Sequence, residues 1–132
     1  MIVDARGLPI AVHLEGANVH ETRLVEPVLK ERFVKDTPKR LGGDKAYDSD
    51  PLDEKLRELG IEMIAQHRKN RKRPATQDGR VARRLKRRWK VERCNSWLKN
   101  CRRLLVRHEF YPENFLAFVH LACILILLRN LC

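Results

Sequence analysis

The stretch Val81–Arg107 reads VARRLKRRWKVERCNSWLKNCRRLLVR. It contains no Gly or Pro, and its apolar residues recur at steps of three and four, as on one face of a helix. These apolar residues are Val91, Cys94, Leu98, Cys101 and Leu105. The pattern predicts one continuous helix that packs this face against a core.

A second face of the same helix is polar and carries one acid. Arg88, Glu92, Asn95 and Lys99 lie three or four residues apart, and Glu92 is the only acidic residue in 79–108. A carboxylate among cations would repel phosphate unless a divalent cation lies between them, so the pattern indicates a metal-dependent phosphoryl-transfer site. A solvated ion pair between Glu92 and Arg88, worth roughly a few tenths of a kcal/mol, is the simpler explanation on spacing alone.

The positive charge of the chain is concentrated in one half. The 132 residues include 28 Lys and Arg against 17 Asp and Glu, which leaves a net charge of +11. Residues 67–107 hold seventeen Lys and Arg and two acids, a balance of +15, so the remainder carries −4. This asymmetry predicts a localised polyanion site, with nucleic acid as the leading partner. The length allows one domain at most.

The cysteines and the apolar segments indicate the expected compartment. Cys94 and Cys101 are two helical turns apart, about 10 Å, which is too far for a disulfide. We expect core thiols in a reducing cytoplasm, and the start MIVDAR lacks a secretory leader.

The apolar run Phe115–Leu128 is shorter than the roughly 20 residues that a membrane span needs. It predicts a buried helix, or one that packs on a part of the protein outside this chain, with His120 as a core histidine.

The residues before the basic stretch predict alternating short elements. These are a β-hairpin around Gly7 and Pro9, a helix over Thr22–Phe33, a strand from Arg40, a helix over Pro51–Leu59 and a strand over Ile61–Ala65. Residues 67–80 then form a polar, basic linker. A solvated surface loop and a specific DNA contact explain this linker equally well.

The strand from Arg40 runs into the acidic segment GGDKAYDSD. Carboxylates at strand ends are common catalytic positions, because a loop can present them there. Asp48 and Asp50 fit better as caps of the next helix, with Asp50 at the N-cap and Pro51 at the first helical position. Asp44 lies too far upstream to cap that helix and is open for another role.

Two of these motifs resemble those of a known family. GGDKAYDS and RWKVERCNSWLKNCRR are similar to the second and third acidic motifs of the DDE transposases of bacterial insertion sequences, the IS4/IS5 group. The third motif of that group has Tyr, Arg, Glu and Lys, and Leu85, Arg88, Glu92 and Lys99 occupy these positions, so Leu replaces Tyr. Residues 3–21 also resemble the segment just after the family's first catalytic Asp.

The resemblance implies an α/β, RNase H-like catalytic core. Its three carboxylates would hold two Mg²⁺ or Mn²⁺ ions, one to activate water or a 3′-hydroxyl and one to stabilise the leaving oxygen of a DNA phosphodiester. Asp44 would be the second of these carboxylates and Glu92 the third.

The resemblance also implies a DNA-binding surface on the basic stretch. Arg88 and Lys99 would hold phosphates of the transposon ends, and further candidate DNA contacts are Arg93, Arg102 and Arg103. The two tryptophans of the stretch would stack on an unpaired base or serve the core.

The chain departs from the family at the first carboxylate. That Asp lies on a strand before the hairpin, and Asp4 is on the wrong strand to replace it. We therefore expect an incomplete core that lacks the first strand: a β-hairpin, then alternating helices and short strands, then two long helices. Residues 1–132 would be the C-terminal portion of a transposase catalytic domain, with the linker 67–80 within it.

Such a portion would be inactive alone. Its expected partners are DNA, the upstream half of the transposase and a second copy on DNA, with no membrane. Two other interpretations remain: a non-catalytic, basic nucleic-acid-binding module, and a fragment without a stable fold whose exposed Phe115–Leu128 helix drives association.

Overall fold

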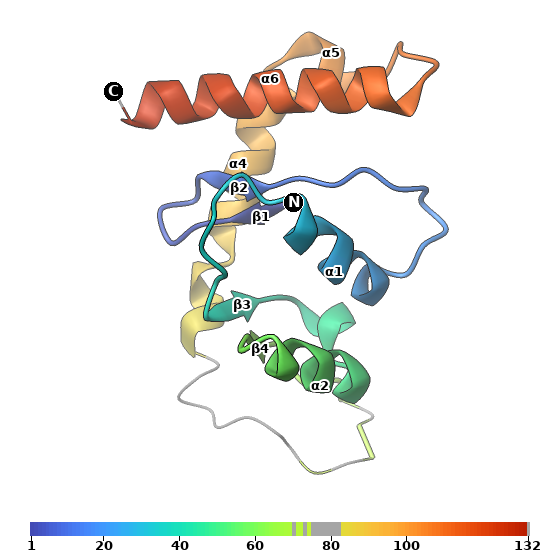
Figure 1. Ribbon diagram of the computed structural model, residues 1–132, viewed down its shortest axis with the longest axis vertical. Coiled ribbons are helices and arrows are strands. Elements are labelled where there is room, and N and C mark those ends of the chain that lie inside the picture. Colours follow the sequence, from blue (N-terminus) through green and yellow to red (C-terminus); the bar gives the residue numbers. More distant parts are fainter. Residues whose placement is uncertain (70, 73, 75–82, 132) are drawn as a thin grey trace. The chain divides into compact units, whose positions relative to one another are not determined.

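The computed structural model describes residues 1–69, 71, 72, 74 and 83–131 (Figure 1). The chain divides into two compact units. Unit 1 comprises Met1–Val19, Leu24–Val34 and Trp89–Cys132, and unit 2 comprises His20–Arg23 and Lys35–Arg88. The order of elements, a hairpin followed by alternating helices and short strands and then by helices, is the predicted one (Figure 1).

The chain begins with the predicted hairpin. Strands β1 (Ile2–Val3) and β2 (Pro9–Ala11) pair antiparallel. Asp4 builds the turn, because its Oδ1 accepts hydrogen bonds from the N–H groups of Arg6 at 2.8 Å and Leu8 at 2.9 Å. Gly7 completes the turn with a φ of 89°, a conformation that glycine adopts without the steric penalty of a Cβ.

Helix α1 (Glu21–Lys30) is shorter than predicted at its C-terminal end. Its buried residues are Val25, Val28 and Leu29. The expected end at Phe33 is wrong, because the chain after the helix turns to bond strand β2. Arg32 forms a β-bridge with Ala11, and the N–H of Phe33 donates to the carbonyl of Ile10 at 2.8 Å.

Unit 2 is built around a strand–helix–strand arrangement. Strands β3 (Arg40–Gly42) and β4 (Glu62–Ile64) pair parallel, and helix α2 (Asp50–Glu58) connects them. The helix buries Leu52 and Leu56 and ends before Gly60, which has a φ of 73°. These elements confirm the predicted strand, helix and strand.

The basic stretch is not one helix, which contradicts the prediction from its apolar spacing. It contains the 3-10 helix η2 (Arg83–Arg87), helix α4 (Trp89–Lys99) and the short helix α5 (Arg102–Leu105), while residues 81 and 82 lie outside the described part. Like charges three and four residues apart weaken an α-helix, and η2 is almost entirely cationic. Between α4 and α5 the backbone of Cys101 is extended, with φ −85° and ψ 111°, so the helix cannot continue there.

The core of unit 1 lies where α4 meets the hairpin and the last helix. Its buried centre is Leu8, Cys94 and Ile126, and the partly buried residues packed on it are Met1, Val3, Trp97, Leu98 and Leu127. Cys94 and Cys123 are buried thiols, as predicted, and Cys101 is a half-buried free thiol. Burial raises the pKa of Cys123 to about 11.

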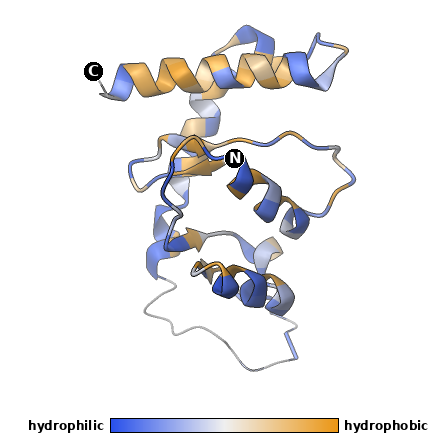
Figure 2. Ribbon diagram, in the orientation of Figure 1, coloured by the Kyte–Doolittle hydropathy of each residue, from blue (hydrophilic) through white to orange (hydrophobic). Residues whose placement is uncertain are grey.

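Helix α6 (Pro112–Leu131) is apolar on nearly every side (Figure 2). The prediction of a buried helix is confirmed on one face, which carries Ala122, Cys123 and Ile126. Another face is about half exposed and carries Leu121, Ile124, Leu125 and Leu128. Over Pro112–Asn130 the helix is long and apolar enough to cross a membrane by length and composition, a test that core helices of soluble proteins also pass. The partly buried His120 ring packs edge-on against Phe33 at 5.6 Å, as suits a core histidine.

Candidate functional site

Asp44 follows β3 and is held by the short 3-10 helix η1 (Lys45–Tyr47). Its Oδ1 accepts a hydrogen bond from the N–H of Ala46 at 2.8 Å, so Asp44 caps η1. Asp44 is too far from α2 to cap it, as expected, but no sequence pattern predicted the short helix that it does cap. The half-buried carboxylate thus stands at the C-terminal end of a parallel strand, where open sheets commonly place functional groups.

The second glycine of the GGDKAY segment, Gly43, allows Tyr47 to pack closely behind Asp44. A Cβ on Gly43 would lie 2.6 Å from Cε of Met63 and 2.7 Å from Cδ2 of Tyr47, closer than real Cβ contacts. Burial, together with the nearby carboxylates of Glu21 and Asp44, raises the pKa of Tyr47. The tyrosine is therefore a neutral packing element of the Asp44 loop.

Asp48 is an anchor for the segment that follows β4, and it ends η1 instead of capping α2 as predicted. Its side chain is 4% exposed and accepts hydrogen bonds from Nδ1 of His67 at 2.9 Å, the N–H of Arg68 at 2.8 Å and Nη1 of Arg71 at 2.6 Å. Burial acts to raise the pKa of Asp48, but these hydrogen bonds and the charge of Arg71 hold it below the ordinary value.

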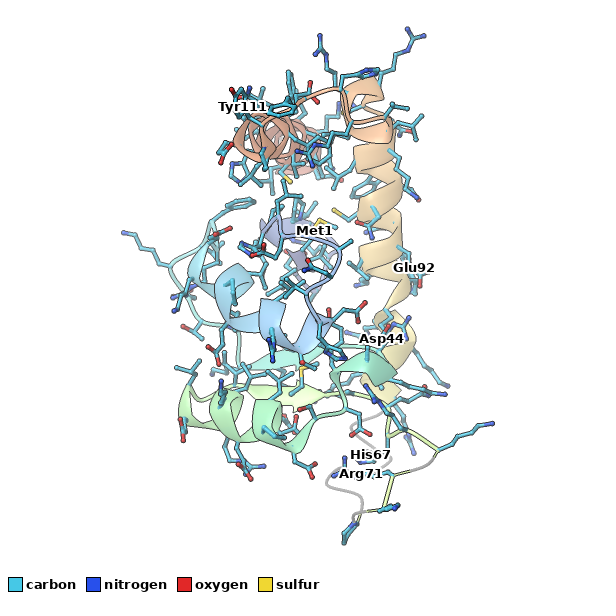
Figure 3. All side chains as sticks on the ribbon, turned by 90° about the vertical axis from the view of Figure 1, so that its right-hand side faces the viewer. Met1, Asp44, His67, Arg71, Glu92 and Tyr111 are labelled. Carbon is cyan, nitrogen blue, oxygen red and sulfur yellow. The ribbon has the colours of Figure 1, made fainter. Side chains whose placement is uncertain are left out.

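Asp50 completes this cluster, which we name the Asp48 clasp: Asp48, Asp50, His67, Arg68 and Arg71. Nη2 of Arg71 donates to Oδ1 of Asp50, and Figure 3 shows Arg71 beside His67. Helix α2 begins at Asp50, so the predicted N-cap role of Asp50 is wrong and Ser49 occupies that position. The predicted linker 67–80 is thus tied down at its start, and its residues 70, 73 and 75–80 lie outside the described part.

Glu92 lies on the exposed side of α4 in unit 1 (Figure 3). Asn95 and Lys99 share this helical face by their spacing and are also exposed. Arg88 does not belong to the helix, because it lies in the turn before α4, where its N–H donates to the carbonyl of Leu85 at 3.0 Å. The polar face predicted from Arg88 to Lys99 therefore begins at Glu92.

The two candidate metal ligands lie in different units, Asp44 in unit 2 and Glu92 in unit 1. Their convergence on shared ions stays a prediction. Across residues 1–69, 71, 72, 74 and 83–131, no group of three or more His, Cys, Asp or Glu is arranged to hold a metal ion. Each residue still offers carboxylate oxygens that reach solvent, the donor type that Mg²⁺ and Mn²⁺ prefer.

Arg93 is stacked between the two tryptophans of the chain. Its guanidinium lies 4.9 Å from the ring centre of Trp89 and 4.7 Å from that of Trp97, and Nη2 donates to the carbonyl of Arg6 in the hairpin turn. Nζ of Lys90 donates to the neighbouring carbonyl of Ala5. The i, i+4, i+8 spacing of Trp, Arg and Trp was visible in the sequence, but its partner in the hairpin was not.

This stack distinguishes Arg93 from the other predicted DNA contacts. Its guanidinium is already engaged with the hairpin, whereas Lys99 and Arg102 are exposed, and Arg103 is exposed but bonds Glu109 at 3.0 Å. Arg102 and Arg103 line a cavity of about 400 Å³ together with His108. None of the predicted DNA contacts is tested by the geometry alone.

The comparisons with known proteins agree with the resemblance to DDE transposases. A family model described as the transposase DDE domain matches residues 1–127. A curated relative from Burkholderia cepacia, named "Putative transposase for insertion sequence element IS402", is 33% identical over 134 residues. The match covers 96% of the chain and 60% of that relative, so the chain spans about three fifths of the relative's length.

No solved structure matches the chain, so the RNase H-like architecture stays a prediction. The assignment to the IS4/IS5 group also stays a prediction. The family match over residues 1–127 decides the family, although it does not decide the group within it. The chain belongs to the family of transposase DDE domains.

Proposed function

We propose that this chain supplies two of the three metal-binding carboxylates of a transposase, Asp44 and Glu92, together with part of its DNA-binding surface. The observation that carries the proposal is the setting of Asp44. A half-buried carboxylate is held by its own 3-10 helix at the end of a parallel strand, within a chain that matches the family. The complete protein would cut and join transposon ends by phosphoryl transfer in an RNase H-like core.

Mg²⁺ or Mn²⁺ fits these donors, because both carboxylates are hard oxygen ligands that reach solvent. The bound ions would supply Lewis-acid stabilisation of the charge at the reacting phosphodiester. The Ala46 N–H holds Asp44 in one orientation. A pre-oriented carboxylate loses less side-chain entropy when it binds a cation than a freely rotating one does.

The exposed cations would hold the DNA. Lys99 shares the polar face of α4 with Glu92, so it would bind phosphate on the side where the carboxylate binds metal. Arg88, Arg102 and Arg103 would extend this surface, because each guanidinium that meets a phosphate releases condensed counterions. Arg93 would act mainly through its contact with the hairpin.

The first carboxylate of the set of three would come from a segment outside this chain. Asp4 does not serve this role, because its Oδ1 accepts from two backbone N–H groups of the hairpin turn and its Oδ2 pairs with Arg6. We therefore expect no DNA cleavage by the chain alone. An upstream transposase segment, a second copy on DNA and a cytoplasmic location complete the proposal.

The proposal is tested by Mn²⁺ titration of the chain bound to a short DNA duplex, followed by electron paramagnetic resonance. We expect Asp44→Asn and Glu92→Gln each to weaken Mn²⁺ binding while DNA binding persists. Asp36→Asn is the matched control, because Asp36 is an exposed carboxylate outside both motifs. Mn²⁺ affinity that is equal in all three variants would overturn the metal assignment.

A second candidate function is a non-catalytic nucleic-acid-binding module. The balance of +15 over residues 67–107 favours it, because such a surface binds phosphate without metal. In that case Glu92→Gln removes a repulsive charge, so DNA binding becomes equal or tighter. Mn²⁺ binding would not respond to either acidic position.

A further inference from the structure

The corner between α5 and α6 contains a cavity, open to solvent, that combines two arginines of the third motif with a residue outside it. Its volume is about 400 Å³, and Arg102, Arg103 and His108 line it. All three residues belong to unit 1. The sequence predicted each arginine as a separate DNA contact. The structure places both around the same cavity, together with a histidine that lies outside the motifs.

The loop that carries His108 is pinned by Arg107. Nε of Arg107 donates to the carbonyl of Glu109 at 3.0 Å, and Nη2 donates to the carbonyl of Phe110 at 3.2 Å. The same guanidinium lies 5.6 Å from the ring centre of Phe115 on α6. Arg107 therefore fixes the loop and is not itself a candidate ligand.

Arg103 is also held in place before any ligand arrives. Its Nη1 donates to Oε1 of Glu109 at 3.0 Å, and its guanidinium lies 5.3 Å from the ring centre of Phe118. Glu109 is 7% exposed at its side chain. Burial acts to raise the pKa of Glu109, but hydrogen bonds from Arg103 and from backbone N–H groups hold it below its usual value, so the carboxylate stays ionised.

The cavity keeps an excess of positive charge after this pairing. Arg102 is exposed, and within the described residues no carboxylate pairs with its guanidinium. Two guanidiniums against the single carboxylate of Glu109 leave a charge of +1. The pocket is therefore suited to an anion.

We propose that this cavity is a phosphate-binding pocket that holds a backbone phosphate of DNA beyond the end of α4. Arginine N–H groups match phosphate oxygens in pairs, and the imidazole N–H of His108 supplies a third direction of hydrogen bonding. The proposal rests on the proposed function for the identity of its ligand. Free phosphate has the same chemistry, so the experiment must separate the two sources.

The test uses the whole chain and compares DNA with inorganic phosphate. Fluorescence anisotropy with a short labelled duplex, at about 50 to 200 mM salt, gives the affinity and its salt dependence. We expect Arg102→Gln and His108→Gln to weaken binding several-fold, and Arg102→Gln to lower the salt slope by about 0.9, the value of one phosphate contact. Arg57→Gln is the matched control, an exposed arginine on α2.

A second readout reports on the pocket itself. The imidazole NMR signals of His108 should shift when DNA is added, and this shift should be lost in Arg102→Gln. If both variants bind DNA with the affinity and salt slope of Arg57→Gln, the pocket proposal is wrong while DNA binding stands. If the chain binds no DNA but inorganic phosphate shifts His108, the pocket stands and the proposed function fails.

Discussion

Replacing Gly7 by alanine should destabilise unit 1 by about 3 kcal/mol. An L-residue in the left-handed region costs about 1–2 kcal/mol, and Gly7 has a φ of 89°. The new Cβ would lie 2.8 Å from Nη2 of Arg93 and 3.2 Å from Cβ of Lys90. Arg93 must then move, which costs about 1 kcal/mol for its hydrogen bond to Arg6 and about 0.5–1 kcal/mol for its stacking on two indole rings.

Urea unfolding followed by tryptophan fluorescence measures this loss directly. Both tryptophans of the chain, Trp89 and Trp97, flank Arg93, so their emission reports the unfolding of unit 1. Gly60→Ala, followed by circular dichroism, is the matched control. Gly60 also has a positive φ, 73°, but a Cβ there would meet nothing within 4 Å, so only the backbone penalty of about 1–2 kcal/mol applies.

A double-mutant cycle separates the backbone strain at residue 7 from the loss of the Arg93 contacts. In an Arg93→Met background, Gly7→Ala should cost only the backbone penalty, so the coupling free energy should be at least about 1 kcal/mol. Additive effects of the two substitutions, or a loss below about 0.5 kcal/mol for Gly7→Ala alone, would refute the role assigned to the hairpin contact.

Asp48→Asn should lower stability at neutral pH by about 2 kcal/mol, because it removes a buried, charge-assisted hydrogen-bond acceptor. The folded-state pKa of Asp48 is lowered, so its contribution is present above the unfolded value near 3.9 and is lost as the pH falls through the folded value. Acid unfolding curves should therefore be shallower for the variant, and equal curves would contradict the clasp. In a Cys132→Ser chain at pH 8, Cys101 should react with a thiol reagent while Cys123 stays protected until unfolding. Burial shields the Cys123 thiol and raises its pKa to about 11. Fast labelling of Cys123, detected by mass spectrometry, would be inconsistent with this burial. Gly43→Ala should destabilise unit 2 by about 1–3 kcal/mol through overpacking, measured by circular dichroism, and an unchanged urea midpoint would argue against close packing behind Asp44.

The positions of the strands and of most helices followed from local sequence patterns. The hairpin around Gly7 and the elements from Arg40 to Ala65 were predictable, because alternation, apolar spacing and turn residues act over a few neighbours. The division of the described part of the basic stretch into three short helices was not predictable from these patterns. Apolar spacing across Val81–Arg107 predicted one continuous helix, but the repulsion of successive cations and the extended backbone at Cys101 divide the stretch.

The candidate site was predictable in part for the same reason. The position of Asp44 at the end of a strand was predictable, but its cap of η1 was not, because a 3-10 helix of three residues has no periodic pattern. The partners of Asp48 lie 19 to 23 residues away, so no local pattern indicated them. The contact between Arg93 and the hairpin turn spans 87 residues and was equally hidden.

The amino-acid sequence by itself determined the family, the order of the elements and the presence of one acid, Glu92, within a cationic stretch. These properties depend on which residues occur and on their spacing along the chain. Only the tertiary structure decided which charged groups already have partners. It engages Arg93 and Arg71 within the fold and leaves Arg102 beside a cavity. The reason is physical: ion pairs, ring stacking and cavities depend on distances in space, which the chain acquires only when remote segments pack.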